Sequence, residues 1–180
     1  MRHTDRLRSV VIMGVSGAGK STIGRLLAAE LGAQFRDGDD LHPSENVALM
    51  AAGYPLGDAE RTPWLREVGR YLADARTENE SLVVACSALK RAYRDLLREH
   101  VPEAFFVFLD GPMPLVHERI SNRSHDFMPP SLLASQYLSL EPLQADESGI
   151  RVDITMPPDQ MIELIAEQLT SAASASRNAS

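Results

Sequence analysis

A glycine-rich segment near the start of the chain has the residue types needed to hold the phosphates of a nucleotide. It fits the pattern G-x-x-x-x-G-K-[ST] and comprises Gly14, Val15, Ser16, Gly17, Ala18, Gly19, Lys20 and Ser21. Glycines let backbone amides turn onto phosphate oxygens, and the N-terminus of the following helix adds a positive dipole. We expect Lys20 to bridge the β- and γ-phosphates of ATP, Ser21 to ligate Mg²⁺, and Thr22 to complete the nucleotide site. The alternative is a glycine-rich turn with a solvated lysine, which the preceding apolar run and the following amphipathic pattern disfavour.

Two carboxylates follow the second apolar run. Asp37 and Asp39 are two residues apart, so in an extended segment their side chains lie on the same side. They come at the carboxyl end of a predicted strand, where ligands bind in open α/β sheets. We assign Asp37 to Mg²⁺ and Asp39 to the attacking hydroxyl, as general base or orienter. The alternative is an acidic turn that caps the segment beginning at His42.

Three basic residues are candidates for binding an anionic acceptor. Arg61 precedes Thr62-Pro63, a predicted helix start, while Lys90 and Arg94 are four residues apart on one face of a later predicted helix. Arginine suits a carboxylate because it pairs in a bidentate manner. The alternative for Lys90 and Arg94 is a solvated basic helix face. Their place after a predicted strand end favours the acceptor pocket.

Two further arginines, Arg119 and Arg123, flank a polar turn. Small kinases use a mobile lid to deliver arginine to the transferring phosphoryl group, where negative charge builds up in the transition state. We therefore predict a lid over about residues 119–130, with Arg123 catalytic and Arg119 near the nucleotide. The alternative is that both are cations that offset a helix dipole.

The elements that must position these residues alternate along the chain. Short β-branched or aromatic runs predict strands, and apolar residues at helical spacing between them predict helices. We expect a three-layer, doubly wound α/β domain with a parallel five-stranded sheet. The predicted strands cover 9–13, 34–36, 81–85, 105–109 and 150–154. The predicted domain covers 9–171, between a flexible N-terminus at 1–8 and a disordered tail at 172–180.

Composition narrows the class of protein. The 180 residues carry a net charge of −7, which suggests neither a nucleic-acid nor a membrane partner. Cys86 is the only cysteine and follows an apolar run, so we expect a buried thiol, a reducing compartment and a cytoplasmic location. No Asn-Lys-x-Asp motif is present, which disfavours a guanine-specific switch protein.

Several segments together resemble the gluconokinases of the P-loop kinase superfamily. Besides the phosphate loop, the resemblance rests on residues 37–43, 58–65 and 86–98, and on Phe127-Met128-Pro129, Ser135-Gln136-Tyr137 and Leu140-Glu141-Pro142. It covers about residues 9–170. The Cys86-Ser87-Ala88-Leu89-Lys90 run and the Pro63-Trp64-Leu65 run are more specific than the phosphate loop.

The resemblance implies a reaction, a fold and a partner. The reaction is ATP + D-gluconate → ADP + 6-phospho-D-gluconate with Mg²⁺, which feeds gluconate into the pentose phosphate pathway. The implied fold is like that of nucleoside-monophosphate kinases, with a small lid, and the implied assembly is a homodimer. Lys20, Ser21 and Arg123 stay on the phosphate side. The implied acceptor-site residues are Asp39, His42, Arg61, Ser87, Lys90, Arg94 and Gln136.

One segment departs from the family pattern, and two other functions stay open. The family's lid usually has His before Phe127, whereas this chain has Asp126 there and His125 one position earlier. A shikimate-kinase-like enzyme is one alternative, although the Cys-Ser-Ala-Leu-Lys run argues against it. A nucleotide-binding regulatory protein without catalysis is the other, although Asp39 and the lid arginine are both present.

Overall fold

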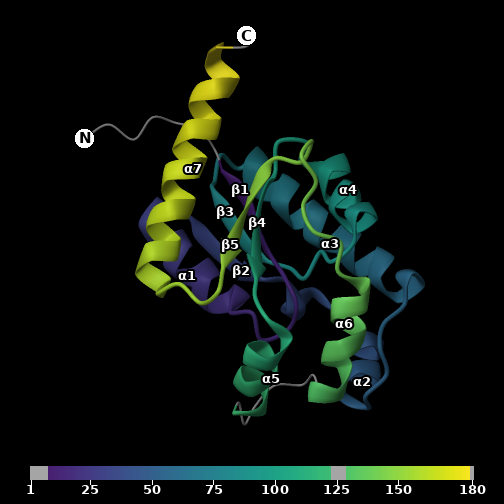
Figure 1. The fold of residues 1–180 in the computed structure, drawn as a ribbon. Helices are drawn as coiled ribbons and strands as arrows, with labels where there is room; N and C mark the ends of the chain where they lie inside the picture. Colours follow the sequence, from purple (N-terminus) through teal and green to yellow (C-terminus); the bar gives the residue numbers. More distant parts are fainter. Residues whose placement is uncertain (1–7, 123–128, 179–180) are drawn as a thin grey trace.

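The centre of the molecule is a parallel β-sheet, seen in the computed structural model, which describes residues 8–122 and 129–178 (Figure 1). The strand order is β2-β3-β1-β4-β5, and every neighbouring pair is parallel. This confirms the predicted α/β fold with five parallel strands. The strands are β1 (Ser9–Met13), β2 (Gln34–Asp37), β3 (Leu82–Ala85), β4 (Phe105–Asp110) and β5 (Gly149–Asp153).

Helices cover both faces of the sheet, which gives the predicted three layers. Helices α1 and α7 pack on one face, and α3 and α4 pack on the other (Figure 1). The α-helices are α1 (Lys20–Leu31), α2 (Ser44–Ala51), α3 (Asp58–Thr77), α4 (Arg91–His100), α5 (Met113–Ser121), α6 (Leu133–Ser139) and α7 (Pro158–Asn178). Short 3₁₀ helices cover Gly38–Leu41 and Pro130–Leu132.

The central strand β1 is apolar at four successive positions because both of its faces are buried. Val10 and Ile12 pack into the core on the α1 and α7 side, while Val11 and Met13 pack into the core on the α3 and α4 side. A parallel strand covered on both faces has no solvent-facing position, so it shows no polar alternation. The phosphate loop therefore starts from a strand that is buried along its whole length.

Two helices differ from the expectation. Helix α3 begins at Asp58 rather than at Thr62, because Gly57 precedes it in an extended conformation and Glu60 Oε2 accepts from the Gly57 amide at 2.9 Å. Thr62 instead donates its hydroxyl to the Asp58 carbonyl at 2.7 Å, one turn earlier. Helix α2 was not predicted at all, since eight residues are too few to show a clear helical period.

The C-terminal segment also differs from the expectation of disorder from residue 172 onward. Helix α7 continues to Asn178, and Ala172 packs against the core on the α1 side. Alanine has the highest intrinsic helix propensity, so a small, polar composition does not by itself end a helix. Over the part of the chain that the structure describes, no helix is long and apolar enough to cross a membrane.

Candidate active site

The phosphate loop joins β1 to α1 in a conformation that requires glycine. Gly14 and Gly19 have φ values of +144° and +99°, and a Cβ on Gly14 would lie 2.7 Å from the Leu109 carbonyl oxygen. Beside Gly19, by contrast, no heavy atom lies within 4 Å of the Cβ position. This open space lies at the N-terminus of α1, where backbone amides and the helix dipole favour an anion. Lys20 Nζ lies over the loop and donates to the Val15 carbonyl at 2.9 Å.

Two oxygen ligands for a divalent cation meet beside this loop. Ser21 Oγ donates to Asp37 Oδ2 at 2.5 Å, although the two residues come from α1 and β2. Hydroxyl and carboxylate oxygens are the donors that Mg²⁺ takes from proteins, with water and substrate phosphates supplying the rest. Accordingly, the described residues contain no cluster of three or more His, Cys, Asp or Glu of the kind that forms an all-protein metal cage. The donor pair therefore fits Mg²⁺ bound together with a nucleotide.

Asp39 is not in the extended segment that the sequence predicted. Residues Gly38–Leu41 form a 3₁₀ helix, and Asp37 caps it by accepting from the Asp39 amide at 3.1 Å. The argument from strand period is therefore wrong, because the chain turns immediately after Asp37. Trp64 Nε1 donates to the Gly38 carbonyl at 2.8 Å, and this buried hydrogen bond anchors the turn to α3. The Asp39 side chain remains half exposed at the carboxyl edge of the sheet.

His42 lies behind Asp39 rather than in the open part of the site. Its side chain is 3% exposed and its ring stacks on Trp64, with 4.0 Å between ring centroids and 16° between planes. Burial and the nearby Arg61 guanidinium lower the pKa of His42 to about 4, so the ring is neutral at neutral pH. A buried, neutral imidazole has little surface left for a sugar acid.

The segment after β3 brings acceptor candidates beside the phosphate loop. The Ser87 carbonyl accepts from the Gly14 amide at 3.2 Å, which ties the two loops together. Lys90 Nζ donates to Asp58 Oδ1 at 2.9 Å, and the Tyr93 hydroxyl donates to the same oxygen. These hydrogen bonds lower the pKa of Asp58, and the one from Lys90 has the larger effect. The exposed Asp58 carboxylate thus holds Lys90 in the segment between β3 and α4.

Arg94 does not belong to the acceptor pocket, which corrects the prediction. Its side chain is 0% exposed and forms a bidentate pair with Glu147, at 2.7 and 2.8 Å. Its remaining donors reach the carbonyls of Ala88, Leu89, Glu141 and Pro142. Burial disfavours the charge on Glu147, but hydrogen bonds from Arg94, the Gln144 amide and Arg98 outweigh it and lower the pKa of Glu147 to about 2. Arg94 therefore stabilises the loop between β3 and α4, which carries the acceptor candidates Ser87 and Lys90, from the buried side.

Gln136 and the lid arginines complete the predicted set. Gln136, on α6, is buried and accepts from the Ser16 amide through Oε1 at 2.6 Å, so it contacts the phosphate loop directly. Arg61 is also buried, and its Nε donates to the Leu56 carbonyl at 3.2 Å. Arg119 Nη2 donates to the Ile154 carbonyl at 3.1 Å, in the turn between β5 and α7. Arg123 and Asp126 lie outside the described residues.

Several residues that organise the site were not predicted to have a role in it. Asp58 and Tyr93 hold Lys90, Glu147 neutralises Arg94, and Asn46 contacts His42. Asp58 lies three positions before Arg61, and Tyr93 lies three positions after Lys90. This spacing from a predicted site residue was the available signal for Asp58 and Tyr93. Nothing local marks Glu147, which is 53 residues from its partner.

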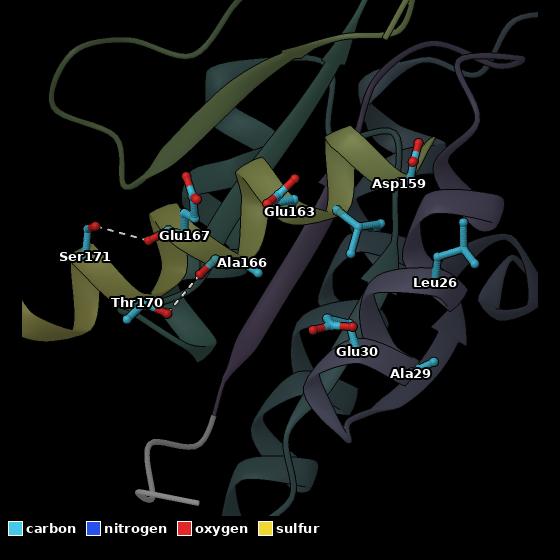
Figure 2. Close-up of a pocket in the computed structure, with 10 residues that line it drawn as sticks. Leu26, Ala29, Glu30, Asp159, Glu163, Ala166, Glu167, Thr170 and Ser171 are labelled. Atoms are coloured by element: carbon cyan, nitrogen blue, oxygen red, sulfur yellow. Dashed lines mark hydrogen bonds between the residues drawn. The ribbon is translucent and has the colours of Figure 1, made fainter. Parts of the chain in front are cut away.

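A groove away from the phosphate loop has the wrong charge for this chemistry. It is a groove of about 1150 Å³ between α1 and α7 (Figure 2). Its lining includes the carboxylates Glu30, Asp159, Glu163 and Glu167 and no described cation. Such a lining repels phosphate and sugar-acid anions alike, so this groove is not a candidate site for the nucleotide or the acceptor.

Comparison with known proteins agrees with this geometry. The shikimate kinase family model matches residues 16–168. The thermosensitive gluconokinase of Escherichia coli is 46% identical over 81% of this chain and 79% of its own. The gluconokinase of Gluconobacter oxydans is 43% identical over 87% and 88%. The crystal structure of a gluconokinase from Sinorhizobium meliloti superposes with a TM-score of 0.87 at 41% identity, covering 97% of this chain and 99% of that one. This chain, which contains the phosphate loop, the acidic turn after β2 and the Ser87–Lys90 loop, belongs to the gluconokinase family of P-loop kinases.

Proposed function

We propose that this protein transfers the γ-phosphoryl group of ATP to the 6-hydroxyl of D-gluconate. One observation carries the proposal: the phosphate loop, the Asp37–Asp39 turn and the Ser87–Lys90 loop meet at the carboxyl ends of adjacent strands. The Ser21–Asp37 and Gly14–Ser87 contacts join them directly. These contacts support a site that combines phosphate binding by the loop, a carboxylate base at Asp39 and a cation for the acceptor's carboxylate at Lys90.

The residues divide the reaction as follows. Lys20 and the loop amides hold the β- and γ-phosphates of ATP. Ser21 and Asp37 would hold Mg²⁺, which would supply positive charge next to the transferring group. Asp39 accepts the proton as the hydroxyl oxygen bonds to phosphorus and the bond to the bridging oxygen of ADP breaks. Lys90 and Ser87 bind the gluconate. Arg123 supports the phosphoryl group and Arg119 the nucleotide.

The family likeness also supports a homodimer, and the single cysteine after an apolar run supports a cytoplasmic location. Both stay predictions of the sequence. Light scattering coupled to size exclusion measures the first, with a mass of twice 19.8 kDa expected.

A coupled ADP-release assay tests the proposed reaction. With the wild-type protein we expect turnover with gluconate and little with other aldonates, shikimate or nucleoside monophosphates. ADP release that does not depend on gluconate would refute the reaction. Preference for shikimate would support the first alternative, and tight ATP binding without any turnover would support the regulatory one.

Replacing the phosphate-loop lysine gives the corresponding residue test. Lys20→Ala is expected to lower kcat by about 10²-fold or more, because one charged donor at the transferring group is lost. Arg66→Ala, which removes an exposed cation from α3, is the matched control. Equal activity of Lys20→Ala and wild type would contradict the assignment.

A further inference from the structure

A buried asparagine outside the predicted site makes two contacts that fix its orientation. Asn46, on α2, donates from Nδ2 to the Glu60 carbonyl at 3.0 Å, and the same nitrogen lies 3.3 Å from His42 Nδ1. A carbonyl oxygen only accepts hydrogen bonds. The Asn46 nitrogen, and not its oxygen, must therefore face Glu60 and His42.

This orientation determines which nitrogen of His42 carries the proton. The Asn46 amino group has only hydrogens to offer, so His42 Nδ1 must accept. In a neutral imidazole the proton is then on Nε2. His42 Nε2 faces Asp39 Oδ1 at 3.9 Å, and the stack on Trp64 holds the ring plane. Burial beside Arg61 lowers the pKa of His42 and keeps the ring neutral.

We propose that Asn46 and His42 are positioning residues: Asn46 sets the tautomer of His42, and the Nε2–H of His42 orients the Asp39 carboxylate toward the acceptor hydroxyl. The inference deepens the proposed function, since it rests on the role of Asp39 there. The 3.9 Å separation belongs to the substrate-free state, and such hydrogen bonds shorten in the reactive complex. His42 thus acts on the acceptor through Asp39, without contact of its own.

The tautomer is measured directly on the full-length protein by long-range ¹H–¹⁵N NMR at neutral pH. We expect His42 Nδ1 to be unprotonated and Nε2 to be protonated in the wild type. In Asn46→Asp the new carboxylate accepts from the ring, so Nδ1 becomes protonated. Asn79→Asp makes the same change at an exposed position after α3 and leaves His42 as in the wild type. A wild-type ring protonated on Nδ1 alone would overturn the inference.

Two substitutions of His42 separate hydrogen bonding from packing. His42→Gln keeps a donor near the Nε2 position without the ring, and His42→Phe keeps the stack on Trp64 without a donor. If orientation of Asp39 matters, kcat falls about 10-fold or more further in His42→Phe than in His42→Gln, with KM for ATP unchanged in both. Equal or higher kcat in His42→Phe would show that the ring only packs.

The two measurements also separate this inference from the proposed reaction. The NMR experiment reads His42 without any substrate, so its outcome does not depend on which acceptor the enzyme uses. Absence of gluconate-dependent ADP release would refute the proposed function. The wrong tautomer, or the reverse order of the two His42 variants on whichever acceptor is turned over, would refute the positioning role.

Discussion

Lys90 and Arg94 are four residues apart and have opposite environments. Lys90 is partly exposed and pairs with the exposed Asp58, whereas Arg94 is fully buried against Glu147. Helical spacing predicted one shared face, but α4 begins only at Arg91, so Lys90 precedes the helix as its extended cap residue. Of these two cations, Lys90 is therefore the one accessible to a ligand.

Removal of Lys90 should affect the acceptor and not the nucleotide. Lys90→Ala is expected to raise KM for gluconate about 10-fold, since a charge-assisted hydrogen bond contributes about 1.5–3 kcal/mol. KM for ATP should stay unchanged in steady-state kinetics. Arg66→Ala again serves as the control, and a parallel rise in both KM values would contradict an acceptor role.

Burial of His42 makes folding stability depend on pH. The pKa is about 4 in the folded protein and 6.5 in the unfolded chain, so between these values the unfolded state binds the extra proton. His42 therefore costs up to about 3 kcal/mol of stability as the pH falls from 6.5 to 4. The charged groups facing it are Arg61 and Asp39.

Urea unfolding followed by the fluorescence of Trp64, the single tryptophan, measures this dependence. His42→Phe should lose less stability than the wild type between pH 6.5 and pH 4. His117→Phe, at an exposed position on α5, is the matched control. An unchanged slope in His42→Phe would show that another group titrates in this window.

At the scale of elements, the loop between β3 and α4 is held in an unusual conformation. Ala88 is a buried non-glycine residue with φ of +42°, a conformation that costs energy and that occurs often at functional sites. Arg94 donates to the carbonyls of Ala88 and Leu89, while the Glu141 amide donates to Leu89 at 2.8 Å. The buried pair thus stabilises the loop that carries Ser87 and Lys90.

Breaking this pair should destabilise the fold strongly. Arg94→Met leaves the Glu147 carboxylate buried and without its main partner, with an expected loss of about 3–5 kcal/mol in urea unfolding. Arg70→Met, which breaks an exposed pair with Glu67, should cost less than about 1 kcal/mol. The double variant Arg94→Met/Glu147→Leu should recover part of the loss, because no charge is then left unpaired. A small effect of Arg94→Met would show that water replaces the arginine.

At the scale of the whole molecule, the strand order decides which loops become neighbours. With the order β2-β3-β1-β4-β5, the segments that follow β1, β2 and β3 share one edge of the sheet. They supply the phosphate loop, the acidic turn and the acceptor loop, and Gln136 reaches them from α6. The site therefore exists only in the folded domain.

A nucleotide that binds this edge should stabilise the whole domain. At 100 times its Kd, a non-hydrolysable ATP analogue with Mg²⁺ adds about 2.7 kcal/mol, because it binds the folded state alone. This corresponds to a rise in Tm of about 5–11 °C by differential scanning fluorimetry, since a chain of this length gains about 2–4 °C per kcal/mol. Lys20→Ala should show a smaller rise, and Arg66→Ala the full one. An equal rise in Lys20→Ala would place the nucleotide elsewhere.

The sequence by itself determined the features that depend on local order. The phosphate loop, the five strands and most of the helices were predicted because a motif, a buried strand or a helical period lies within a few consecutive residues. The short helix α2 was not predicted. The acidic turn was located correctly, although its 3₁₀ geometry was not, since the cap from Asp37 and the contact with Trp64 come from the fold.

Only the tertiary structure decided which polar residues are buried in ion pairs and which stay exposed at the candidate site. Lys90 pairs with Asp58, 32 residues away in the sequence, and Arg94 pairs with Glu147, 53 residues away. Burial and charge pairing are therefore set by partners that no local pattern reveals. The same holds for His42, whose neutrality, stack on Trp64 and contact with Asn46 arise from the packing of α2 and α3 against the turn. Local order thus predicted the phosphate chemistry, and long-range packing assigned the roles around it.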